Sequence, residues 1–291
     1  MIFDVQRGSY VDGPGVRTTV FVKGCNLRCQ WCHNPESHVA APQRLWYASK
    51  CTHCGKCASK CKNNAITYDP TTGALSLSKD KCTLCGRCAL FCPVDAIAIC
   101  GQQMDTDELL SIIEKERSIY DATGGGMTVT GGECMLQPDF LAELLQKCRE
   151  RGIHTAVDTA GDVPFEAFEK VLPYTDLFLY DIKCISSELH RRFTGVSNER
   201  ILINYLQLLE AGAVIHVRVP LMQEFNADEE EFGRIAAFLA AHPPQLTELL
   251  PYHAMGENKY RALLGEEPPH FTPPTEETLK KYRETIRRNE P

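Results

Sequence analysis

Short apolar runs alternate with amphipathic segments along most of this chain. Amphipathic stretches with a period near 3.6 predict helices, and the β-branched runs between them predict strands. Asp105 and Glu108 form a capping box at the start of one such helix. Strands are expected near 127–130, 154–158, 176–182, 213–219 and 246–252, and helices near 139–151, 164–172, 199–211, 228–241 and 275–288.

A further apolar run at 17–23 adds a sixth strand to this series. Six β/α units in succession are typical of a parallel sheet that curls into a full or partial barrel. Residues 37–104 interrupt the series, because they are rich in cysteine, internally repeated and short of long periodic runs. We therefore expect an α/β fold in which residues 1–36 and 105–291 form the barrel and residues 37–104 form an insert.

Unusual polar groups follow the predicted strands. The carboxyl ends of parallel strands meet on one side of a barrel, so these groups are expected to form one composite site. In chain order they are Cys25, Cys29 and Cys32; Gly131, Gly132 and Glu133; Asp158 and Thr159; Asp181 and Lys183; and Arg218 and His253 at the ends of the last two strands.

Simpler roles remain open for several of these residues. Glu133 could cap the helix that follows it, and Asp158 could be a turn residue. Asp181 and Lys183 would share one face of a strand, where an ordinary surface ion pair is possible. Their common position after strands favours the functional interpretation.

The cysteines indicate iron chemistry. Cys25, Cys29 and Cys32 have the spacing C-x3-C-x2-C on one loop, so they can bind three irons of a 4Fe-4S cluster and leave the fourth iron open to a substrate. The chain has 15 cysteines and no recognisable export signal, which predicts metal ligands in a reducing cytoplasm rather than disulfides. Buried structural thiols are expected at Cys100, Cys134, Cys148 and Cys184.

The insert repeats a four-cysteine pattern with the spacing C-x2-C-x2-C-x3-C. This is the spacing of bacterial two-cluster ferredoxins, in which the fourth cysteine of each run binds the other cluster. The repeat extends to Asn64-Ala65-Ile66 and Asp95-Ala96-Ile97. Cluster one is expected to use Cys51, Cys54, Cys57 and Cys92, and cluster two Cys82, Cys85, Cys88 and Cys61.

Two alternatives concern this insert. A pair of zinc ribbons would use C-x2-C pairs separated by longer gaps, which the two intact runs do not match. Seven Lys or Arg and three Asp between Lys50 and Asp95 give a charge of +4. That charge either compensates two anionic clusters or forms a docking patch for an acidic electron donor.

Composition excludes other classes of protein. The chain is 43% apolar and 24% charged, as in ordinary globular proteins. Its net charge of −7 gives no reason to expect a nucleic-acid partner. No segment approaches the roughly 18 apolar residues that a membrane helix needs, so no membrane association is expected.

Several motifs together resemble one family. They are the Cys25-x3-Cys29-x2-Cys32 loop, Asp12-Gly13-Pro14-Gly15-Val16-Arg17, the stretch Gly124 to Glu133, Asp181-Ile182-Lys183 and Leu249-Leu250-Pro251-Tyr252-His253. Together, in their order along the chain, they resemble the activating enzymes of glycyl-radical enzymes, in the radical S-adenosylmethionine (SAM) superfamily. The resemblance covers nearly all of the chain and implies a partial (β/α)6 TIM-like barrel with a ferredoxin-like insert.

The resemblance also implies roles for individual residues. The three loop cysteines would bind the cluster whose open iron takes the amino and carboxylate groups of SAM. The candidate catalytic residues are Cys25, Cys29, Cys32 and Lys183. The candidate SAM-binding residues are Trp31, Cys32, His33, Gly131, Gly132, Glu133, Asp158, Asp181, Ile182, Lys183 and Arg218. Asp158, Thr159 and Asp181 match a monovalent-cation site (Na⁺ or K⁺) of the pyruvate formate-lyase activase.

The implied reaction is reductive cleavage of SAM to a 5′-deoxyadenosyl radical that takes hydrogen from a backbone glycine of a partner glycyl-radical enzyme. Three 4Fe-4S clusters, a flavodoxin or ferredoxin-type electron donor and a monomeric state are expected. Two alternatives remain: a radical SAM enzyme that acts on a small molecule or peptide, and a polyferredoxin-type electron carrier. An open iron argues against the carrier, which needs no ligand on iron.

Overall fold

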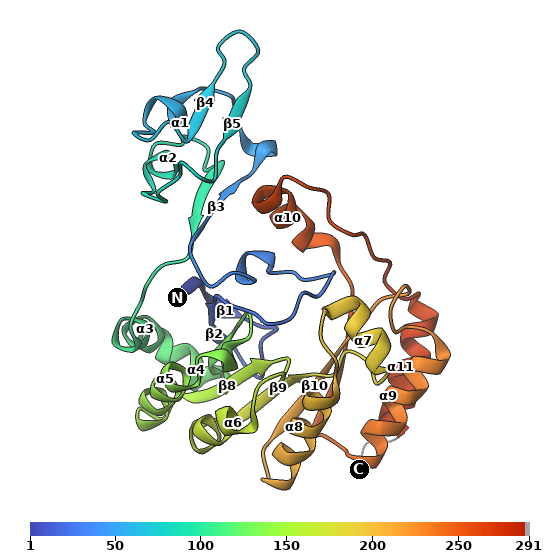
Figure 1. Ribbon diagram of the computed structural model, residues 1–291. Helices are drawn as coiled ribbons and strands as arrows, with labels where there is room; N and C mark the ends of the chain where they lie inside the picture. The colour runs from blue at the N-terminus through green and yellow to red at the C-terminus, as the bar shows by residue number, and fades with distance from the viewer. Residues whose placement is uncertain (289–291) are drawn as a thin grey trace.

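A seven-stranded sheet forms the centre of the computed structural model, which describes residues 1–288. The strand order is β1-β2-β7-β8-β9-β10-β11 (Figure 1). Strand β1 (Ile2–Ser9) is antiparallel to β2 (Arg17–Val22), and every later neighbour is parallel. The parallel strands are β2, β7 (Gly126–Gly131), β8 (His154–Thr159), β9 (Leu177–Asp181), β10 (Ile215–Leu221) and β11 (Leu246–Pro251).

The six parallel strands are the six that the sequence predicts, in chain order. Most of the helices cover the outer side of the sheet, whereas α10 packs on residues 35–46 (Figure 1). The helices are α3 (Thr106–Ile113), α4 (Arg117–Thr123), α5 (Pro138–Glu150), α6 (Phe165–Val171), α7 (Ser187–Thr194), α8 (Glu199–Glu210), α9 (Glu229–Ala241), α10 (Glu257–Leu264) and α11 (Glu276–Arg288). The capping box of Asp105 and Glu108 is confirmed at the start of α3.

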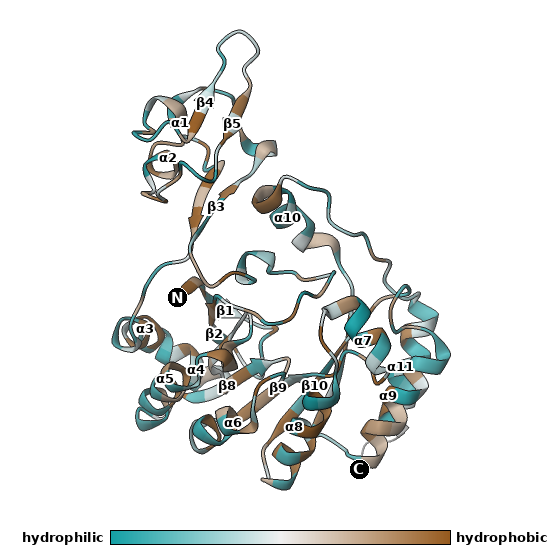
Figure 2. Cartoon of the chain, in the orientation of Figure 1, coloured by the Kyte–Doolittle hydropathy of each residue, from teal (hydrophilic) through white to brown (hydrophobic). Residues whose placement is uncertain are grey.

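The two faces of the sheet differ in polarity. Outward side chains such as Met127, Phe178 and Val217 join one large apolar core under the helices. Inward side chains of the same strands include Thr128, Asp158 and Arg218. On this inner face Arg218 donates to Asp158, and Thr128 accepts from Arg17. Figure 2 shows the strands as mainly hydrophobic and the exposed helix α7 as hydrophilic. The period of two along each strand therefore directs polar groups to the inner face.

Residues 43–100 project from one end of the sheet (Figure 1). This segment contains two antiparallel strand pairs, β3 (Gln43–Trp46) with β6 (Ile97–Cys100), and β4 (Ile66–Tyr68) with β5 (Leu75–Leu77). The short helices α1 (Lys56–Ser59) and α2 (Arg87–Leu90) each carry one cysteine of the repeated pattern. Short 3-10 turns are Pro35–Ser37, Ala48–Lys50, Glu114–Glu116, Cys134–Leu136, Leu172–Tyr174 and Ala254–Gly256.

One predicted position is wrong. Arg218 was expected near the end of its strand, but β10 continues to Leu221 and places Arg218 inside it. The strand passes through Pro220 because β9 pairs with β10 only as far as Arg218, so no neighbour on that side needs the missing N–H. The sequence also did not predict β1, α4, α7 or α10. No helix among residues 1–288 is long and apolar enough to cross a bilayer.

Candidate active site

The loop that carries Cys25, Cys29 and Cys32 begins where β2 ends and is tied to α7. The backbone N–H of Arg28 donates to the carbonyl of Thr194 at 2.7 Å, and that of Gln30 donates to Phe193 at 3.0 Å. Both acceptors lie in the last turn of α7, whose carbonyls have no partner within the helix. The end of α7 therefore fixes the course of the cysteine loop.

The three loop thiols are partly buried and are poor thiolates on their own. Burial raises the pKa of all three, that of Cys25 to about 12. The Sγ atom of Cys32 accepts a hydrogen bond from the backbone N–H of Asn34 at 3.4 Å. Iron replaces the thiol proton and stabilises the thiolate, so this donor set fits an iron-sulfur cluster.

Lys183 and Asp181 face this loop from the end of β9. Lys183 Nζ lies 2.5 Å from Asp181 Oδ2, and the lysine side chain is 7% exposed. Burial alone would lower the pKa of Lys183, but the Asp181 carboxylate and the Cys29 thiol raise it above its usual value. The ion pair considered above is therefore present, but its lysine is buried beside the cysteines rather than exposed on the surface.

Asp158 and Arg218 lie next to each other on the inner face. Asp158 Oδ2 accepts a hydrogen bond from Thr130 Oγ1 at 2.7 Å and lies 3.4 Å from Arg218 Nη1. Burial raises the pKa of Asp158 to about 6, and the Arg218 guanidinium opposes the rise. Arg218 also contacts Glu248 at 3.2 Å. Side chains of β7, β8, β10 and β11 thus share one network.

The Gly131-Gly132-Glu133 segment packs directly on the cysteine loop. The backbone N–H of Glu133 donates to the carbonyl of Gly24 at 2.8 Å. A Cβ atom on Gly132 would lie 2.1 Å from that same oxygen, so only glycine permits this approach. The Gly131 φ of +118° also favours glycine.

The Glu133 carboxylate is fully buried and has three donors. It accepts hydrogen bonds from Met135 N at 3.0 Å, Thr159 Oγ1 at 2.7 Å and Ala160 N at 2.9 Å. Burial raises its pKa to about 7. The capping role considered for this residue is correct, because its side chain caps the turn Cys134–Leu136. The Thr159 hydroxyl donates its hydrogen bond to Glu133 and not to Asp158.

The remaining predicted residues lie in apolar surroundings, some beside the loop and some in the main core. Trp31 packs on Phe225 with ring centroids 4.5 Å apart and belongs to a buried aromatic cluster. His33 stacks on His253 at 4.0 Å, and its Nε2 lies 2.9 Å from the His253 carbonyl oxygen. Ile182 is buried in the main core. Cys100, Cys134, Cys148 and Cys184 are buried, as the sequence predicts.

Helix α10 is part of the site that the sequence did not indicate. Tyr260 OH donates to the carbonyl of Cys29 at 3.3 Å, and Lys259 Nζ lies 2.7 Å from Glu36 Oε1. Glu36 follows the cysteine loop and its side chain is 6% exposed. The charged residue Glu36, directly after Asn34 and Pro35, was the one sign of this contact in the sequence. Its partner Lys259 lies more than 200 residues away.

Arg17 is a second buried group whose role the sequence analysis did not assign. Its Nε donates to Thr128 Oγ1 and its Nη2 to the carbonyl of Met127, both at 2.6 Å. Burial lowers its pKa to about 10. Arg17 closes the motif that starts at Asp12, and the carbonyl of Asp12 accepts from Thr128. The motif therefore braces β2 against β7.

The eight cysteines of the repeat line two separate small cavities. One is lined by Cys51, Cys54, Cys57 and Cys92, and the other by Cys61, Cys82, Cys85 and Cys88. The structure thus brings together the two exchanged sets that the spacing predicts. The backbone repeats as well, because Ala65 N and Ala96 N each donate to a cysteine Sγ, of Cys61 and Cys92, at 3.2 Å.

Left-handed residues recur at equal positions in both halves of the repeat. His53 and Leu84 both have a φ of +53°, and Asn64 and Asp95 have φ of +50° and +48°. Non-glycine residues rarely adopt this conformation. Turns of this kind point successive N–H groups into one concavity, which suits an anionic cluster.

Comparison with known proteins gives two family matches. The radical SAM superfamily matches residues 82–236, and the 4Fe-4S dicluster domain matches residues 50–96. The first match does not include the cysteine loop at 25–32. The second lies within the predicted insert and favours the ferredoxin interpretation over zinc ribbons.

Two curated relatives resemble nearly the whole chain. The choline trimethylamine-lyase activating enzyme of Oleidesulfovibrio alaskensis is 41% identical over 92% of this chain and 88% of its own length. The trans-4-hydroxy-L-proline dehydratase activating enzyme of Clostridioides difficile is 43% identical over 97% and 94%. Among solved structures, a radical SAM methyltransferase from Sphaerobacter thermophilus has a similar fold, with a TM-score of 0.53 at 12% identity over 99% of this chain and 74% of its own.

Proposed function

Because this chain belongs to the activating enzymes of glycyl-radical enzymes in the radical SAM superfamily, we propose that it installs a glycyl radical in a partner enzyme. The cluster bound at the cysteine loop supplies, when reduced, the electron that splits SAM into methionine and a 5′-deoxyadenosyl radical, which removes a hydrogen atom from a backbone glycine of that partner. The sheet is taken to be a partial (β/α)6 barrel formed by residues 1–36 and 105–291, with residues 37–104 as a ferredoxin-like insert.

One observation carries this proposal. The thiols of Cys25 and Cys29 lie close enough to Lys183 for its charge to oppose the rise of their pKa, although the two segments are more than 150 residues apart. The thiols that would hold the cluster and a row of charged side chains thus face each other. An electron carrier would not need charged side chains opposite the cluster-binding thiols.

The residues around the site have distinct proposed roles toward SAM. Glycines 131 and 132 hold the main chain against the start of the cysteine loop, because a Cβ on either would meet the backbone of Val22 or Gly24. Lys183 is positively charged and suits the SAM carboxylate, and Asp181 holds the lysine in place. Asp158 and Arg218 supply opposite charges for the polar groups of the ligand. Trp31, His33 and Ile182 supply apolar surface that excludes water.

The proposed cofactors are SAM and three 4Fe-4S clusters, two of them in the insert. A monovalent cation beside Asp158, Thr159 and Asp181 belongs to the proposal as well. Arg218 and Lys183 already bring positive charge to the two carboxylates, so the cation would share them with these side chains. The cysteine content supports a reducing compartment such as the cytoplasm.

The proposed partners are a glycyl-radical enzyme and a flavodoxin or ferredoxin-type electron donor, with the chain acting as a monomer. The insert clusters would relay electrons from the donor to the cysteine loop. Replacing Cys54 or Cys85 by alanine would then slow activation with the protein donor. Unchanged activation rates in both variants would rule out the relay.

The deciding experiment mixes the reduced, iron-loaded protein and SAM with candidate partners. The choline lyase and the 4-hydroxyproline dehydratase are the first two, because the relatives described above activate them. Electron paramagnetic resonance is expected to show a glycyl radical in one partner. Cys29→Ala should abolish this signal, whereas Cys148→Ala, which replaces a buried thiol outside the clusters, should preserve it. SAM cleavage with a small molecule or peptide as the only acceptor would instead support the other radical SAM class.

A further inference from the structure

The two cavities of the insert differ in charge although their backbones are alike. The cavity of cluster two, formed by Cys61, Cys82, Cys85 and Cys88, is lined by four basic residues: Arg44, Lys62, Lys81 and Arg87. The cavity of cluster one, formed by Cys51, Cys54, Cys57 and Cys92, is lined by one, Lys56. No acidic residue lines either cavity among those described. The internal repeat is therefore electrostatically unequal.

Arg44 is the clearest break in the repeat. It pairs with Ile99 in the ladder of β3 and β6. At the equivalent position of the other half, Tyr68 pairs with Leu75 in the ladder of β4 and β5. Leu75 lines the cavity of cluster one, as Arg44 lines that of cluster two. The repeat thus places a guanidinium beside one cluster and an isobutyl group beside the other.

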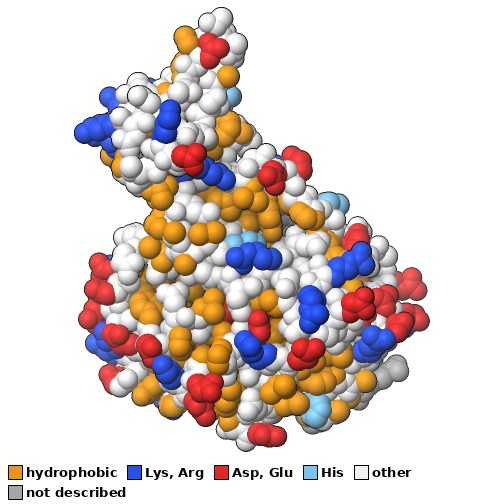
Figure 3. Space-filling view, viewed as in Figure 1, with side chains coloured by type: hydrophobic (Ala, Val, Ile, Leu, Met, Phe, Trp, Pro, Cys, Tyr) orange, Lys and Arg blue, Asp and Glu red, His pale blue; other side chains and the backbone are white. Residues whose placement is uncertain are grey.

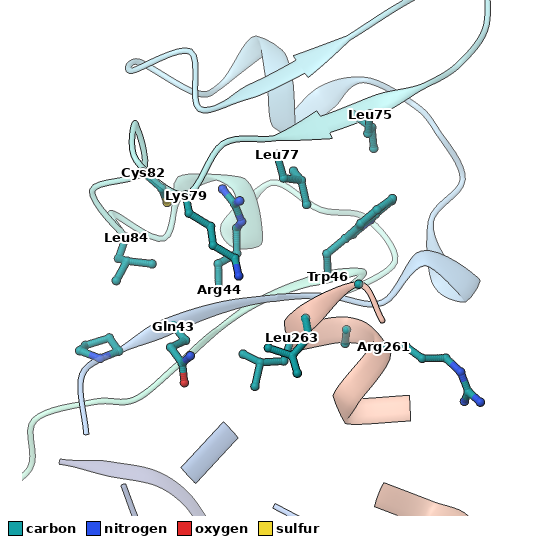
Figure 4. Close-up of a pocket in the computed structure, with 14 residues that line it drawn as sticks. Gln43, Arg44, Trp46, Leu75, Leu77, Lys79, Cys82, Leu84, Arg261 and Leu263 are labelled. Carbon is teal, nitrogen blue, oxygen red and sulfur yellow. The ribbon is translucent and has the colours of Figure 1, made fainter. Parts of the chain in front are cut away.

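Arg44 is half-buried, and its guanidinium has a buried donor without a partner. Its Nη1 atom is inaccessible and has no hydrogen-bond partner among residues 1–288, and the same holds for Nε of Arg87. Lys62 and Lys81 are exposed, so solvent screens their charges. Figure 4 shows the Arg44 side chain rising from β3 toward the segment that carries Lys79 and Cys82. A buried donor without a partner costs free energy, which an acceptor such as a cluster sulfur would restore.

Backbone hydrogen bonds do not cancel this difference. The bonds to Cys61 and Cys92 are equal in length, as described above. One further bond, from His53 N to Cys51 Sγ at 3.4 Å, occurs on the side of cluster one. The His53 N–H carries no formal charge, so the effect of this bond is small beside that of a guanidinium.

We propose that Arg44 raises the reduction potential of cluster two above that of cluster one, so that an electron entering the insert settles on cluster two. The inference rests on the dicluster assignment of the proposed function. Each cluster accepts one electron from an external reductant and becomes one unit more negative. A nearby positive charge stabilises the more negative state, and net charge and hydrogen bonds to sulfur are known determinants of cluster potential.

Cluster two is also the insert cluster that lies on the side of α10. Cys82 is the one insert cysteine that also lines a wider cavity of about 420 Å³, which lies between the insert and α10 and is bordered there by Ala262, Leu263 and Leu264. Figure 3 shows hydrophobic side chains gathered between the projecting insert and the body of the molecule. Helix α10 contacts the cysteine loop through Tyr260. The cluster of higher potential is therefore the one on the side of the helix that touches the reactive centre.

The test is a redox titration of the full-length, iron-loaded chain, monitored by electron paramagnetic resonance. Cys25, Cys29 and Cys32 are replaced by alanine in all samples, so that only the insert clusters contribute. Two one-electron steps are expected. Arg44→Leu, which copies the residue of the other half, should lower the equilibrium constant of the easier reduction about tenfold, about 59 mV for one electron, and leave the other step unchanged.

Three further variants separate charge from other causes. Arg44→Lys should retain most of the wild-type potential, Arg44→Gln should lower it as Arg44→Leu does, and Leu75→Arg should raise the lower potential. Unchanged potentials in Arg44→Leu with both clusters loaded would overturn the inference. If that variant fails to load, Arg44→Gln decides in the same way. Fewer than two clusters in the parent insert would instead contradict the dicluster assignment itself.

Discussion

Lys183 Nζ lies 2.5 Å from Asp181 Oδ2, and this ion pair is the charged group that faces the thiol of Cys29. The lysine side chain is 7% exposed and the aspartate 25%. Breaking a buried pair leaves one charge without compensation, so the two residues act as a unit. Under the proposed role of Lys183, stability and SAM binding depend on the same contact.

Lys183→Met is expected to reduce both stability and SAM binding. The free energy of unfolding should fall by about 2 kcal/mol, below the usual range for buried pairs because water reaches Asp181. SAM cleavage should fall about 100-fold, as when one preorganised charged donor is removed. Anaerobic urea unfolding and the rate of 5′-deoxyadenosine formation measure the two effects.

Lys170→Met is the matched control. Lys170 pairs with Asp139 at 2.6 Å, but the two side chains are 49% and 84% exposed. Loss of such a surface pair should change stability by less than about 1 kcal/mol. Wild-type cleavage by Lys183→Met would show that the pair has no role toward SAM.

Gly132→Ala should separate the cysteine loop from β7. The added Cβ would lie 2.1 Å from the carbonyl oxygen of Gly24, and backbone cannot yield as a flexible side chain can. We expect a loss of about 1–3 kcal/mol and selective loss of iron from the cysteine loop. Iron analysis, together with the electron paramagnetic resonance signal that changes when SAM is added, measures the iron content of the cysteine loop.

Gly233→Ala serves as the comparison for Gly132→Ala. A Cβ at Gly233 meets nothing within 4 Å, and the residue lies within α9. Alanine in a helix interior is favoured by up to about 1 kcal/mol over glycine. This variant should hold its iron; equal iron in both variants would contradict the packing argument.

The strand series and the candidate site could be predicted from the sequence because one physical rule governs both. Outward apolar residues such as Val129 and Val157 bury against helices, which makes each strand recognisable as a run. The residues just after each run then lie at one edge of the parallel sheet, as Lys183 and Glu133 do. The exchanged cysteine sets followed from spacing in the same way.

Contacts between distant segments could not be predicted. Glu133 has donors from Met135, Thr159 and Ala160, and nothing local indicates the last two. Strand β1 alternates between partly buried and exposed residues at the edge of the sheet, so its hydrophobic signal is weak. Strand β10 runs two residues past the predicted end at 219, because β11 pairs with it as far as Leu221.

The contact between Lys259 and Glu36 predicts a coupled pair of mutations. Lys259→Met would leave the Glu36 carboxylate buried without its cation, at a cost of about 1–3 kcal/mol, because Lys259 is one-third exposed. Glu36→Gln in the same chain removes the stranded charge. The double variant should therefore be more stable than the sum of the single changes indicates.

Urea unfolding of the four proteins in this cycle measures the coupling free energy. The iron content of the cysteine loop should follow stability, since α10 contacts that loop through Lys259 and Tyr260. Strictly additive effects would show that the two side chains do not stabilise each other.

His190 predicts how stability depends on pH. Its Nδ1 atom lies 2.7 Å from the carbonyl oxygen of Val196 and 3.0 Å from Thr194 Oγ1, and the Thr194 carbonyl holds the cysteine loop. Burial lowers the pKa of His190 from 6.5 to about 4. Between these values the unfolded chain binds the proton and the folded chain does not, so stability is complete above pH 6.5 and falls as the pH decreases toward 4.

His190→Asn should remove this part of the pH dependence. The asparagine amide can take the place of Nδ1 as donor to Val196 and does not titrate in this range. Between pH 8 and pH 5.5 the wild type should lose about 1.4 kcal/mol through His190 alone, and the variant should lose that much less. Anaerobic urea unfolding at the two pH values gives the difference. If the variant loses as much stability as the wild type on acidification, protonation of His190 is not what loosens α7 and the cysteine loop that it holds.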